Sequence, residues 1–349
     1  MKETIQRIEP VAQDWLERAA ARQLQLTKPP GSLGELESIA NRLAAIQQTL
    51  RPAVSRRRIY VVAADHGVVA EGVSVYPREV TAQMVYNFLR GGAAINVLAR
   101  QGAIEVGVVD AGVDADFGDA PGLIQAKVVR GTANFTRGPA MTRDEAVKSV
   151  EVGIDLARTA AAEGVELLGI GEMGIGNTTA ASAIAATLTE SAPEAVIGHG
   201  AGVDDAGFRR KIAAVKRALE INRPDRTDAL DVLAKVGGAE IGVMAGVALG
   251  AAADRVPVVA DGFISTSAAA LACVLCPNLQ DYLFIGHRSR ERGHNSLIEF
   301  IGQRPLLDLQ MRLGEGTGAA LAMDIITAAA RLLSEMATFA EAGVSDKEA

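Results

Sequence analysis

Short apolar runs alternate along this chain with Ala-rich segments of helical spacing, and this alternation limits the fold more than any other feature. The runs cover residues 58–67, 104–114, 165–174, 256–263 and 281–289. Strands that alternate with helices are typical of successive βαβ units, whose strands pair in parallel. The sequence therefore predicts an α/β fold with a parallel, Rossmann-like sheet flanked by helices.

Each of these runs ends in polar residues and glycines. The ends are Asp65-His66-Gly67, Asp110 with Gly112, Glu172, Asp261-Gly262 and His287-Arg288-Ser289. A turn after a single strand needs Gly and Asp for backbone reasons alone, so one such end says little. Ligands of parallel α/β sheets bind outside the carboxyl ends of the strands. Taken together, the ends predict a binding site at one edge of the sheet.

The two ends of the chain have a different pattern from the middle. With 349 residues, 49% of them hydrophobic, the chain is long enough for one large and one small domain. Residues 11–26 and 316–343 both place apolar side chains at helical spacing. We expect a small helical domain built from residues 1–30 and 305–349, and a large α/β substrate-binding domain formed by residues 31–304.

The charge of the chain excludes several classes of partner. A formal net charge of -7 argues against a nucleic-acid or anionic-membrane surface, because such surfaces attract basic proteins. The first residues lack the apolar core of a signal peptide, and the apolar stretch 241–253 is too short to span a bilayer. We expect a cytoplasmic protein that binds small molecules and neither nucleic acid nor membrane.

A metal site is not expected. Cys273 and Cys276 form a C-x-x-C pair, but zinc would need two more ligands and no second pair exists. The surrounding residues are those of a buried helix that ends before Pro277, where cysteine acts as a small hydrophobe. Asp65 and the chain's histidines lack the tight spacing of metal ligands.

Residues 169–179 contain two overlapping glycine motifs. Gly169-x-Gly171-x-x-Gly174 matches the dinucleotide fingerprint and favours an NAD-dependent oxidoreductase as one alternative. Against this, Glu172 lies inside the turn where a pyrophosphate would bind, and like charges repel. No second strand with an acidic ribose ligand follows at the usual distance.

The second motif is Gly174-x-Gly176-Asn177-Thr178-Thr179, which leads into an Ala-rich helix. Backbone N–H groups at a helix N-terminus suit a single phosphate monoester. The same residues also suit a simple Gly-rich turn with a helix cap. A non-catalytic nucleotide-binding module that uses this turn is therefore another alternative.

A further acidic glycine turn precedes the last long helix, where Glu315 lies between Gly314 and Gly316. A ligand can approach a carboxylate with such small neighbours, and an apolar surround would raise its pKa toward that of a general base. An exposed acid that favours a helix N-terminus by its charge explains the pattern equally well.

Five long blocks together resemble the nicotinate-nucleotide:dimethylbenzimidazole phosphoribosyltransferases. The blocks are residues 64–85, 169–184, 235–252, 260–272 and 312–325, and the resemblance extends from about residue 28 to the C-terminal helix. It implies a parallel sheet of about six strands, a small helical domain made from both termini, a homodimer, and no metal or other cofactor.

The activity implied by the resemblance is transfer of the 5-phosphoribosyl group of nicotinate mononucleotide to 5,6-dimethylbenzimidazole. Inversion at C1′ would give α-ribazole 5′-phosphate and nicotinate. The leaving pyridinium nitrogen is already cationic, so its departure needs no acid. The attacking base must lose one proton, which calls for one carboxylate.

The resemblance also assigns roles to individual residues. Glu315 would be the catalytic base, and Glu172 would lie beside the ribose. The substrate-binding residues would be Gly174, Gly176 and Asn177 at the phosphate, Lys211 and Ser289 as additional donors, and Tyr76, Met84 and Leu313 around the aromatic base.

Small residues recur four apart in the helical segment 239–253, at Gly242, Gly246 and Gly250. This spacing lets another backbone lie close, either within the chain or across a dimer interface. The resemblance favours a two-fold dimer in which one chain helps to close the pocket of the other.

Overall fold

A seven-stranded parallel sheet forms the centre of the computed structural model, which describes residues 1–200 and 202–345. Its strand order is β3-β2-β1-β4-β5-β6-β7, and every pair is parallel. The strands are β1 Arg57–Ala64, β2 Glu105–Gly112, β3 Leu123–Gln125, β4 Leu167–Met173, β5 Val258–Ala260, β6 Leu283–His287 and β7 Pro305–Leu307. The predicted parallel α/β fold is confirmed.

All five apolar runs form strands, and the sheet is one strand larger than the expected number of about six. The edge strands β3 and β7 have three residues each and carry no long apolar run. The central strands β1 and β4 are almost wholly buried, as strands covered on both faces must be. The direction of the strand order reverses between β1 and β4, where α/β sheets bind ligands.

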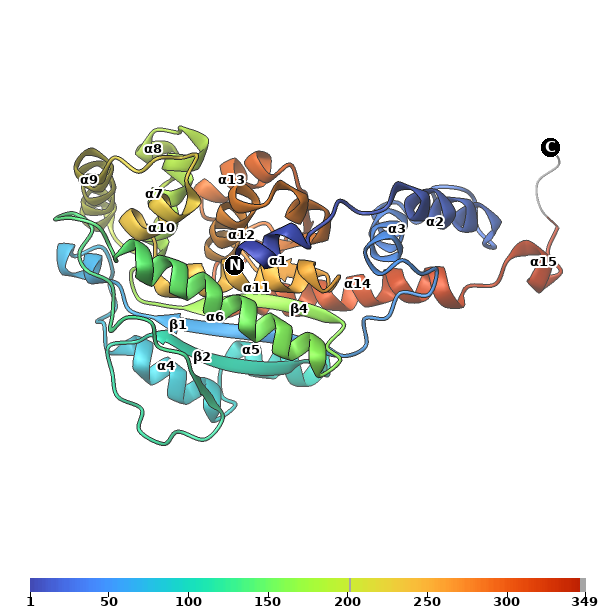
Figure 1. Ribbon diagram of the computed structural model, residues 1–349, viewed down its shortest axis with the longest axis horizontal. Helices are drawn as coiled ribbons and strands as arrows, with labels where there is room; N and C mark the ends of the chain where they lie inside the picture. Colours follow the sequence, from blue (N-terminus) through green and yellow to red (C-terminus); the bar gives the residue numbers. More distant parts are fainter. Residues whose placement is uncertain (201, 346–349) are drawn as a thin grey trace.

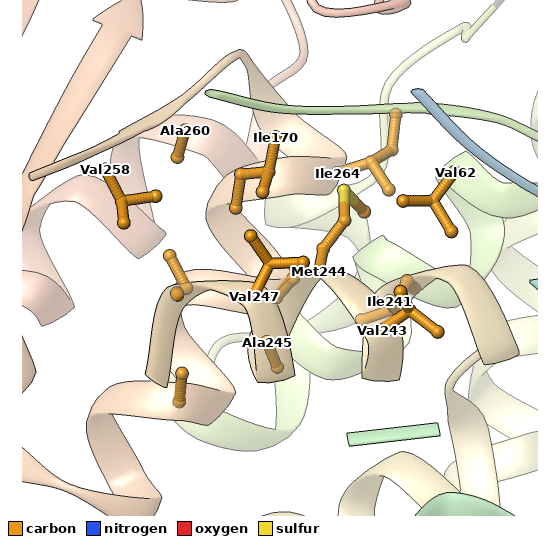
Figure 2. Packing of buried hydrophobic residues seen from close by; sticks show 14 of the residues in the cluster. Val62, Ile170, Ile241, Val243, Met244, Ala245, Val247, Val258, Ala260 and Ile264 are labelled. Carbon is orange, nitrogen blue, oxygen red and sulfur yellow. The ribbon is translucent and has the colours of Figure 1, made fainter. Parts of the chain in front are cut away.

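Helices cover both faces of the sheet (Figure 1). One set comprises α6, α11 and α12, with α11 and α12 lying against the strands; another comprises α4, α5 and α14. Figure 2 shows Val247 of α11 directed toward Ile170 of β4, and the sulfur of Met244 beside Ile264 of α12. The helices are α1 Lys2–Gln6, α2 Gln13–Gln25, α3 Glu35–Gln47, α4 Val80–Leu89, α5 Ala94–Gln101, α6 Arg143–Ala162, α7 Asn177–Thr189, α8 Pro193–Val196, α9 Asp205–Asn222, α10 Ala229–Val236, α11 Ala239–Ala253, α12 Phe263–Leu275, α13 Gly293–Ile301, α14 Thr317–Glu335 and α15 Phe339–Ala342, with 3₁₀ turns η1 Gly67–Glu71 and η2 Pro277–Tyr282.

The glycines of α11 pack against α6 of the same chain. A Cβ atom added at Gly246 would lie 2.0 Å from the carbonyl oxygen of Val150, and one at Gly242 would lie 1.9 Å from the Oγ of Ser149. All residues of α11 are buried. The expectation that this stripe forms a dimer interface is wrong, because α6 already occupies the close approach that the glycines allow.

Helices from both ends of the chain pack together at one end of the molecule (Figure 1). Helix α2 contacts α3 and α14, and Leu26 forms an antiparallel bridge with Thr338. Arg22 Nε also donates to the carbonyl oxygen of Leu333 at 2.8 Å.

The division into residues 1–30 with 305–349 and residues 31–304 stays a prediction. Three elements pack against the domain to which this division does not assign them. Helix α1 contacts α11, β7 belongs to the sheet, and α3 packs mainly against α2 and α14.

Helix α14 is the one helix in the described part of the chain with the length and composition to cross a membrane. In its most apolar window 56% of the residues are buried, and it contacts β4, β5 and β6. A core helix of a folded domain passes the same test of length and composition.

Cys273 and Cys276, around the end of α12, form no disulfide, and burial raises the pKa of the Cys273 thiol to about 12.

Candidate active site

A cavity of about 380 Å³ opens at the carboxyl ends of β4, β5 and β6. Each of these strands places one titratable side chain on its wall, namely Glu172, Asp261 and His287. The start of α7, the first turn of α4 and the loop at residues 312–315 complete the wall. This volume is that of an ordinary small-molecule site.

The ends of β1 and β2 do not reach this wall, so the expectation that all five strand ends meet in one site is wrong for two of them. Asp110 instead lies 2.7 Å from Lys127 Nζ, and its other oxygen accepts from the N–H of Val113. Asp65 is buried and faces Arg78. These carboxylates organise loops beside the cavity.

Most of the residues predicted for the site do lie on the cavity wall. They are Glu172, Glu315, Gly174, Asn177, Ser289, Tyr76, Met84 and Leu313. The other two lie behind the wall. Gly176 packs its backbone against Val69 and His66, and Lys211 is buried beneath the turn at the start of α7.

The dinucleotide fingerprint is not formed in space. Gly169 and Gly171 lie inside β4 rather than in the turn that follows it. A Cβ atom at Gly171 would lie 2.3 Å from the backbone nitrogen of Gly316, so this glycine permits a close crossing of two chain segments. The spacing matches the motif, but the glycines serve packing, which argues against an NAD-dependent oxidoreductase.

The same crossing brings the two predicted catalytic acids together. The N–H of Glu315 donates to the carbonyl oxygen of Glu172 at 3.2 Å. A Cβ atom at Gly314 would lie 2.3 Å from Oε1 of Glu172, so the turn must be glycine there for the carboxylate to fit. Both acids therefore occupy one wall of the cavity.

Glu172 has a strongly perturbed carboxyl group. Burial raises its pKa to about 8, and the nearby charges of Asp261, Glu240 and Glu315 act in the same direction. The side-chain amide of Asn177 donates to Glu172 Oε2 and opposes the shift. Such a shift in a cavity is typical of functional carboxyls.

Glu315 adopts a left-handed backbone conformation, with φ 64°, between two glycines that do the same. Non-glycine residues are rarely found there, and such strain is concentrated at functional sites. The side chain is buried, and its Oε2 has no hydrogen-bond partner among the described residues. Burial raises the pKa of Glu315, which makes its carboxylate a stronger proton acceptor.

Asp261 fixes the turn that carries Glu315. Its carboxylate accepts from the N–H groups of Gly316, Gly318 and Ala319, at 3.1, 2.6 and 3.1 Å. It therefore caps α14, where the helix dipole favours negative charge. The sequence placed Asp261 at a strand end but gave no sign of this capping role, because the partners are distant in the chain.

The turn before α7 has the form expected of a phosphate site. Gly176 has φ 93° and precedes Asn177, the first residue of α7. The first N–H groups of a helix lack intrahelical acceptors, and its dipole attracts anions. The N–H of Ile175 is already used, since it donates to Oγ1 of Thr81 in α4 at 3.1 Å.

A buried lysine supports this turn from behind. Lys211 Nζ donates to Oγ1 of Thr178 at 3.0 Å and to the carbonyl oxygen of Gly198 at 3.2 Å. Burial lowers the pKa of Lys211. Sequence reasoning missed a second cation, Arg312, which lines the cavity and donates to the carbonyl oxygen of Gly200 at 2.8 Å.

Apolar side chains surround the mouth of the cavity. Tyr76 and Leu313 line it and are 50% and 57% exposed, and Met84 lies on the same wall. Phe263 and Ile264, which sequence reasoning did not single out, extend this surface at the start of α12. The cavity thus combines an apolar side with a turn whose form suits an anion, and four acidic residues, Glu172, Asp261, Glu291 and Glu315, lie on its wall.

Comparison with known proteins identifies the family. The sequence pattern of the family described as phosphoribosyltransferase matches residues 8–344. The chain belongs to this family.

Its relatives carry a more specific name. A nicotinate-nucleotide–dimethylbenzimidazole phosphoribosyltransferase of Geobacter metallireducens is 55% identical over 344 residues, which are 99% of this chain and 98% of that protein. One of the same name from Chloroflexus aggregans is 55% identical over 348 residues, 100% of this chain and 99% of the relative. The crystal structure of CobT from Thermus thermophilus matches with a TM-score of 0.92 at 53% identity, covering 96% of this chain and 100% of that one.

Proposed function

We propose that the chain transfers the 5-phosphoribosyl group of nicotinate mononucleotide to 5,6-dimethylbenzimidazole. The observation that carries this proposal is the pair of buried carboxyls, Glu172 and Glu315, on one wall of a cavity with an apolar mouth and an anion-binding turn. The names of the full-length relatives agree with it. An oxidoreductase has no support, because two of the three glycines of its motif, Gly169 and Gly171, lie inside β4.

In the reaction, the bond between C1′ and the pyridinium nitrogen breaks, and its electron pair returns to that nitrogen. One ring nitrogen of the base bonds to C1′ from the opposite face, which inverts the anomeric centre. Glu315 takes the proton from the other ring nitrogen, so that the ring of the product is neutral. The products are α-ribazole 5′-phosphate and nicotinate.

Glu172 acts on the ribose side. In the free protein burial keeps its carboxyl protonated at neutral pH. The pyridinium charge of the bound donor lowers this pKa, because an opposite charge favours the carboxylate. The ionised group then stabilises the positive charge that develops on the ribose as the C1′ bond breaks.

The remaining predicted residues bind the substrates. Gly174 and Asn177 on the cavity wall bind the 5′-phosphate with Ser289 as a further donor, and Gly176 behind the wall shapes the turn that presents them. Lys211 supports this turn from behind, because its Nζ donates to Oγ1 of Thr178. Tyr76, Met84 and Leu313 contact the flat apolar base at the mouth.

We also propose that the chain works as a homodimer in the cytoplasm. The half-exposed side chains of Tyr76 and Leu313 at the cavity mouth support a partner chain that closes the pocket. The glycines of α11 cannot contribute to this interface, since α6 covers them. Two unpaired cysteines support a reducing compartment.

A direct assay tests the proposed activity. Purified protein is incubated with nicotinate mononucleotide and dimethylbenzimidazole, and the products are separated by chromatography. We expect nicotinate and α-ribazole 5′-phosphate in equal amounts. Nucleotide binding without release of nicotinate would identify a non-catalytic binding module instead.

A further inference from the structure

The segment at residues 72–79 carries Tyr76 to the mouth of the cavity and is irregular between η1 and α4. Val73 is buried, whereas Val75 and Tyr76 are 55% and 50% exposed. Apolar packing therefore does not hold the middle of the segment. Its position must be set by polar contacts near its ends.

Arg78 supplies such a contact at one end. Its Nη1 lies 3.0 Å from Oδ2 of Asp114, and its Nε lies 3.8 Å from Oδ1 of Asp65. A Cβ atom added at Gly131 would lie 2.2 Å from Nη2, so the guanidinium rests directly on the backbone of that glycine. Arg78 thus joins the segment to the loops that follow β1 and β2.

The buried ion-pair partner of Arg78, Asp65, is itself held in place. Asp65 is buried, and its backbone bonds to Gly112 and Thr132 at 3.0 Å each. Its Oδ2 accepts from the N–H of Asp114 at 2.8 Å, while Oδ1 has no hydrogen-bond partner among the described residues. Removing the cation that faces this buried oxygen would leave its charge poorly compensated.

Other contacts hold the neighbouring elements without Arg78. At the start of the segment, Arg210 Nε donates to the carbonyl oxygen of Gly72 at 2.8 Å. Beyond its end, Oγ1 of Thr81 accepts from the N–H of Ile175. The carbonyl oxygens of Pro77 and Arg78 also accept from the N–H groups of Val80 and Thr81 in α4. Loss of the Arg78 side chain would therefore loosen residues 74–76 while α4 and the turn before α7 stay in place.

We propose that Arg78 is a positioning residue for the acceptor side of the cavity. By holding residues 72–79 against the loops after β1 and β2, it fixes Tyr76 and thereby sets the affinity for the aromatic base. It does not touch the substrate. This inference rests on the proposed function. It adds that the ion pair between Arg78 and Asp114 governs the binding of dimethylbenzimidazole.

Arg130 offers a matched control. Its Nε lies 2.9 Å from Oδ1 of Asp114, so it bonds the same carboxylate from the solvent side. It belongs to a loop outside the cavity wall. The test compares wild type, Arg78→Met, Arg78→Lys and Arg130→Met by steady-state kinetics with each substrate varied in turn.

For Arg78→Met we expect the KM for dimethylbenzimidazole to rise about tenfold, with kcat and the KM for nicotinate mononucleotide within about twofold of wild type. Arg130→Met should leave all three constants within about twofold. Arg78→Lys, which retains the charge but not the planar fork, should be intermediate. Equal effects of the methionine variants, or equal losses for both substrates, would overturn the inference.

Hydrogen exchange separates this inference from the proposed activity. Without substrates, the peptide covering residues 72–79 should exchange faster in Arg78→Met than in Arg130→Met. If wild type forms no product while this difference is present, the proposed function fails and the anchoring role of Arg78 stands. Unchanged exchange in Arg78→Met would refute the anchoring role whether or not wild type forms product. If Arg78→Met does not fold, the same comparison is made with Arg78→Lys.

Discussion

The N–H of Glu315 donates to the carbonyl oxygen of Glu172 at 3.2 Å, so main-chain atoms set the spacing of the two acids. Gly171 and Gly314 permit this crossing, because a Cβ atom at either position would lie 2.3 Å from an atom of the other segment. The main chain therefore fixes the backbone positions from which the two carboxyl groups extend, and Asn177 holds the carboxyl of Glu172.

Glu315→Gln should retain the fold and nucleotide binding but lose about two to four decades of kcat, the usual contribution of a positioned base. The amide has nearly the same shape and cannot accept the proton. Release of nicotinate in the presence of dimethylbenzimidazole measures the loss. Near-normal turnover in a folded variant would contradict the role of Glu315.

Glu172→Gln should stabilise the protein without substrates at pH 8 while it lowers activity. Because burial raises the pKa of Glu172 to about 8, the folded state holds a proton that the unfolded chain releases near its ordinary carboxyl pKa. The stability due to this group is present at low pH and lost as the pH rises toward and through about 8. Glutamine removes that loss.

The measurement is Tm at pH 5 and pH 8 for wild type, Glu172→Gln and Glu17→Gln, whose side chain is exposed on α2. The gain of Glu172→Gln over wild type should be larger at pH 8. A gain that is equal at both pH values would contradict the raised pKa.

Transfer should continue at full rate in excess EDTA. The pyridinium of the donor leaves without a Lewis acid, and no pyrophosphate is released that would call for Mg²⁺. Initial rates with and without chelator measure this. A rate that EDTA abolishes and Mg²⁺ or Zn²⁺ restores would replace the proposed mechanism with a metal-assisted one.

Gly246→Ala should destabilise the protein by about 1–3 kcal/mol, the usual cost of overpacking a core. The new methyl group would lie 2.0 Å from the carbonyl oxygen of Val150 and would force α11 away from α6. Urea unfolding measures the change. Gly138→Ala is the control, because nothing lies within 4 Å of its Cβ position; equal effects would contradict the close packing of the two helices.

Light scattering should give about twice 36.3 kDa at micromolar concentration. The same measurement on Gly246→Ala tests whether the glycines of α11 contact α6 of the same chain and not a partner chain. Weakening a contact within one chain should leave the mass unchanged. A fully active species of 36.3 kDa would refute the dimer and the shared pocket.

The sheet was predictable because its long strands are continuous apolar runs with polar ends. Strands β3 and β7 escaped prediction, since three residues at a sheet edge need little apolar sequence. The glycines of α11 show what residue spacing alone cannot predict. Their pattern predicts close approach of a backbone, but only the fold shows that this backbone is α6.

The candidate site was predicted best where its residues are close in sequence, as at Glu172, Gly174 and Asn177. The capping of α14 by Asp261 and the bond from Arg312 to Gly200 join segments that are far apart in the chain. No local pattern marks such contacts. The prediction that Asp65 and Asp110 belong to the site was wrong because aspartate at a strand end can also hold a loop in place, as both do here.

The bridge between Leu26 and Thr338 joins segments from the two ends of the chain. During synthesis the N-terminal part of a chain emerges first and begins to fold before the rest is available. Helix α2 can therefore pack early against α3, but its contacts with α14 and with Thr338 form only after those residues have been synthesised, whereas β1, β2 and β4 can already pair. A pause or truncation after α13 would yield a chain that has most of its sheet but lacks both Glu315 and the helix that covers β4 to β6. The active site is thus completed, and the two ends of the chain come into contact, at the same late stage of folding.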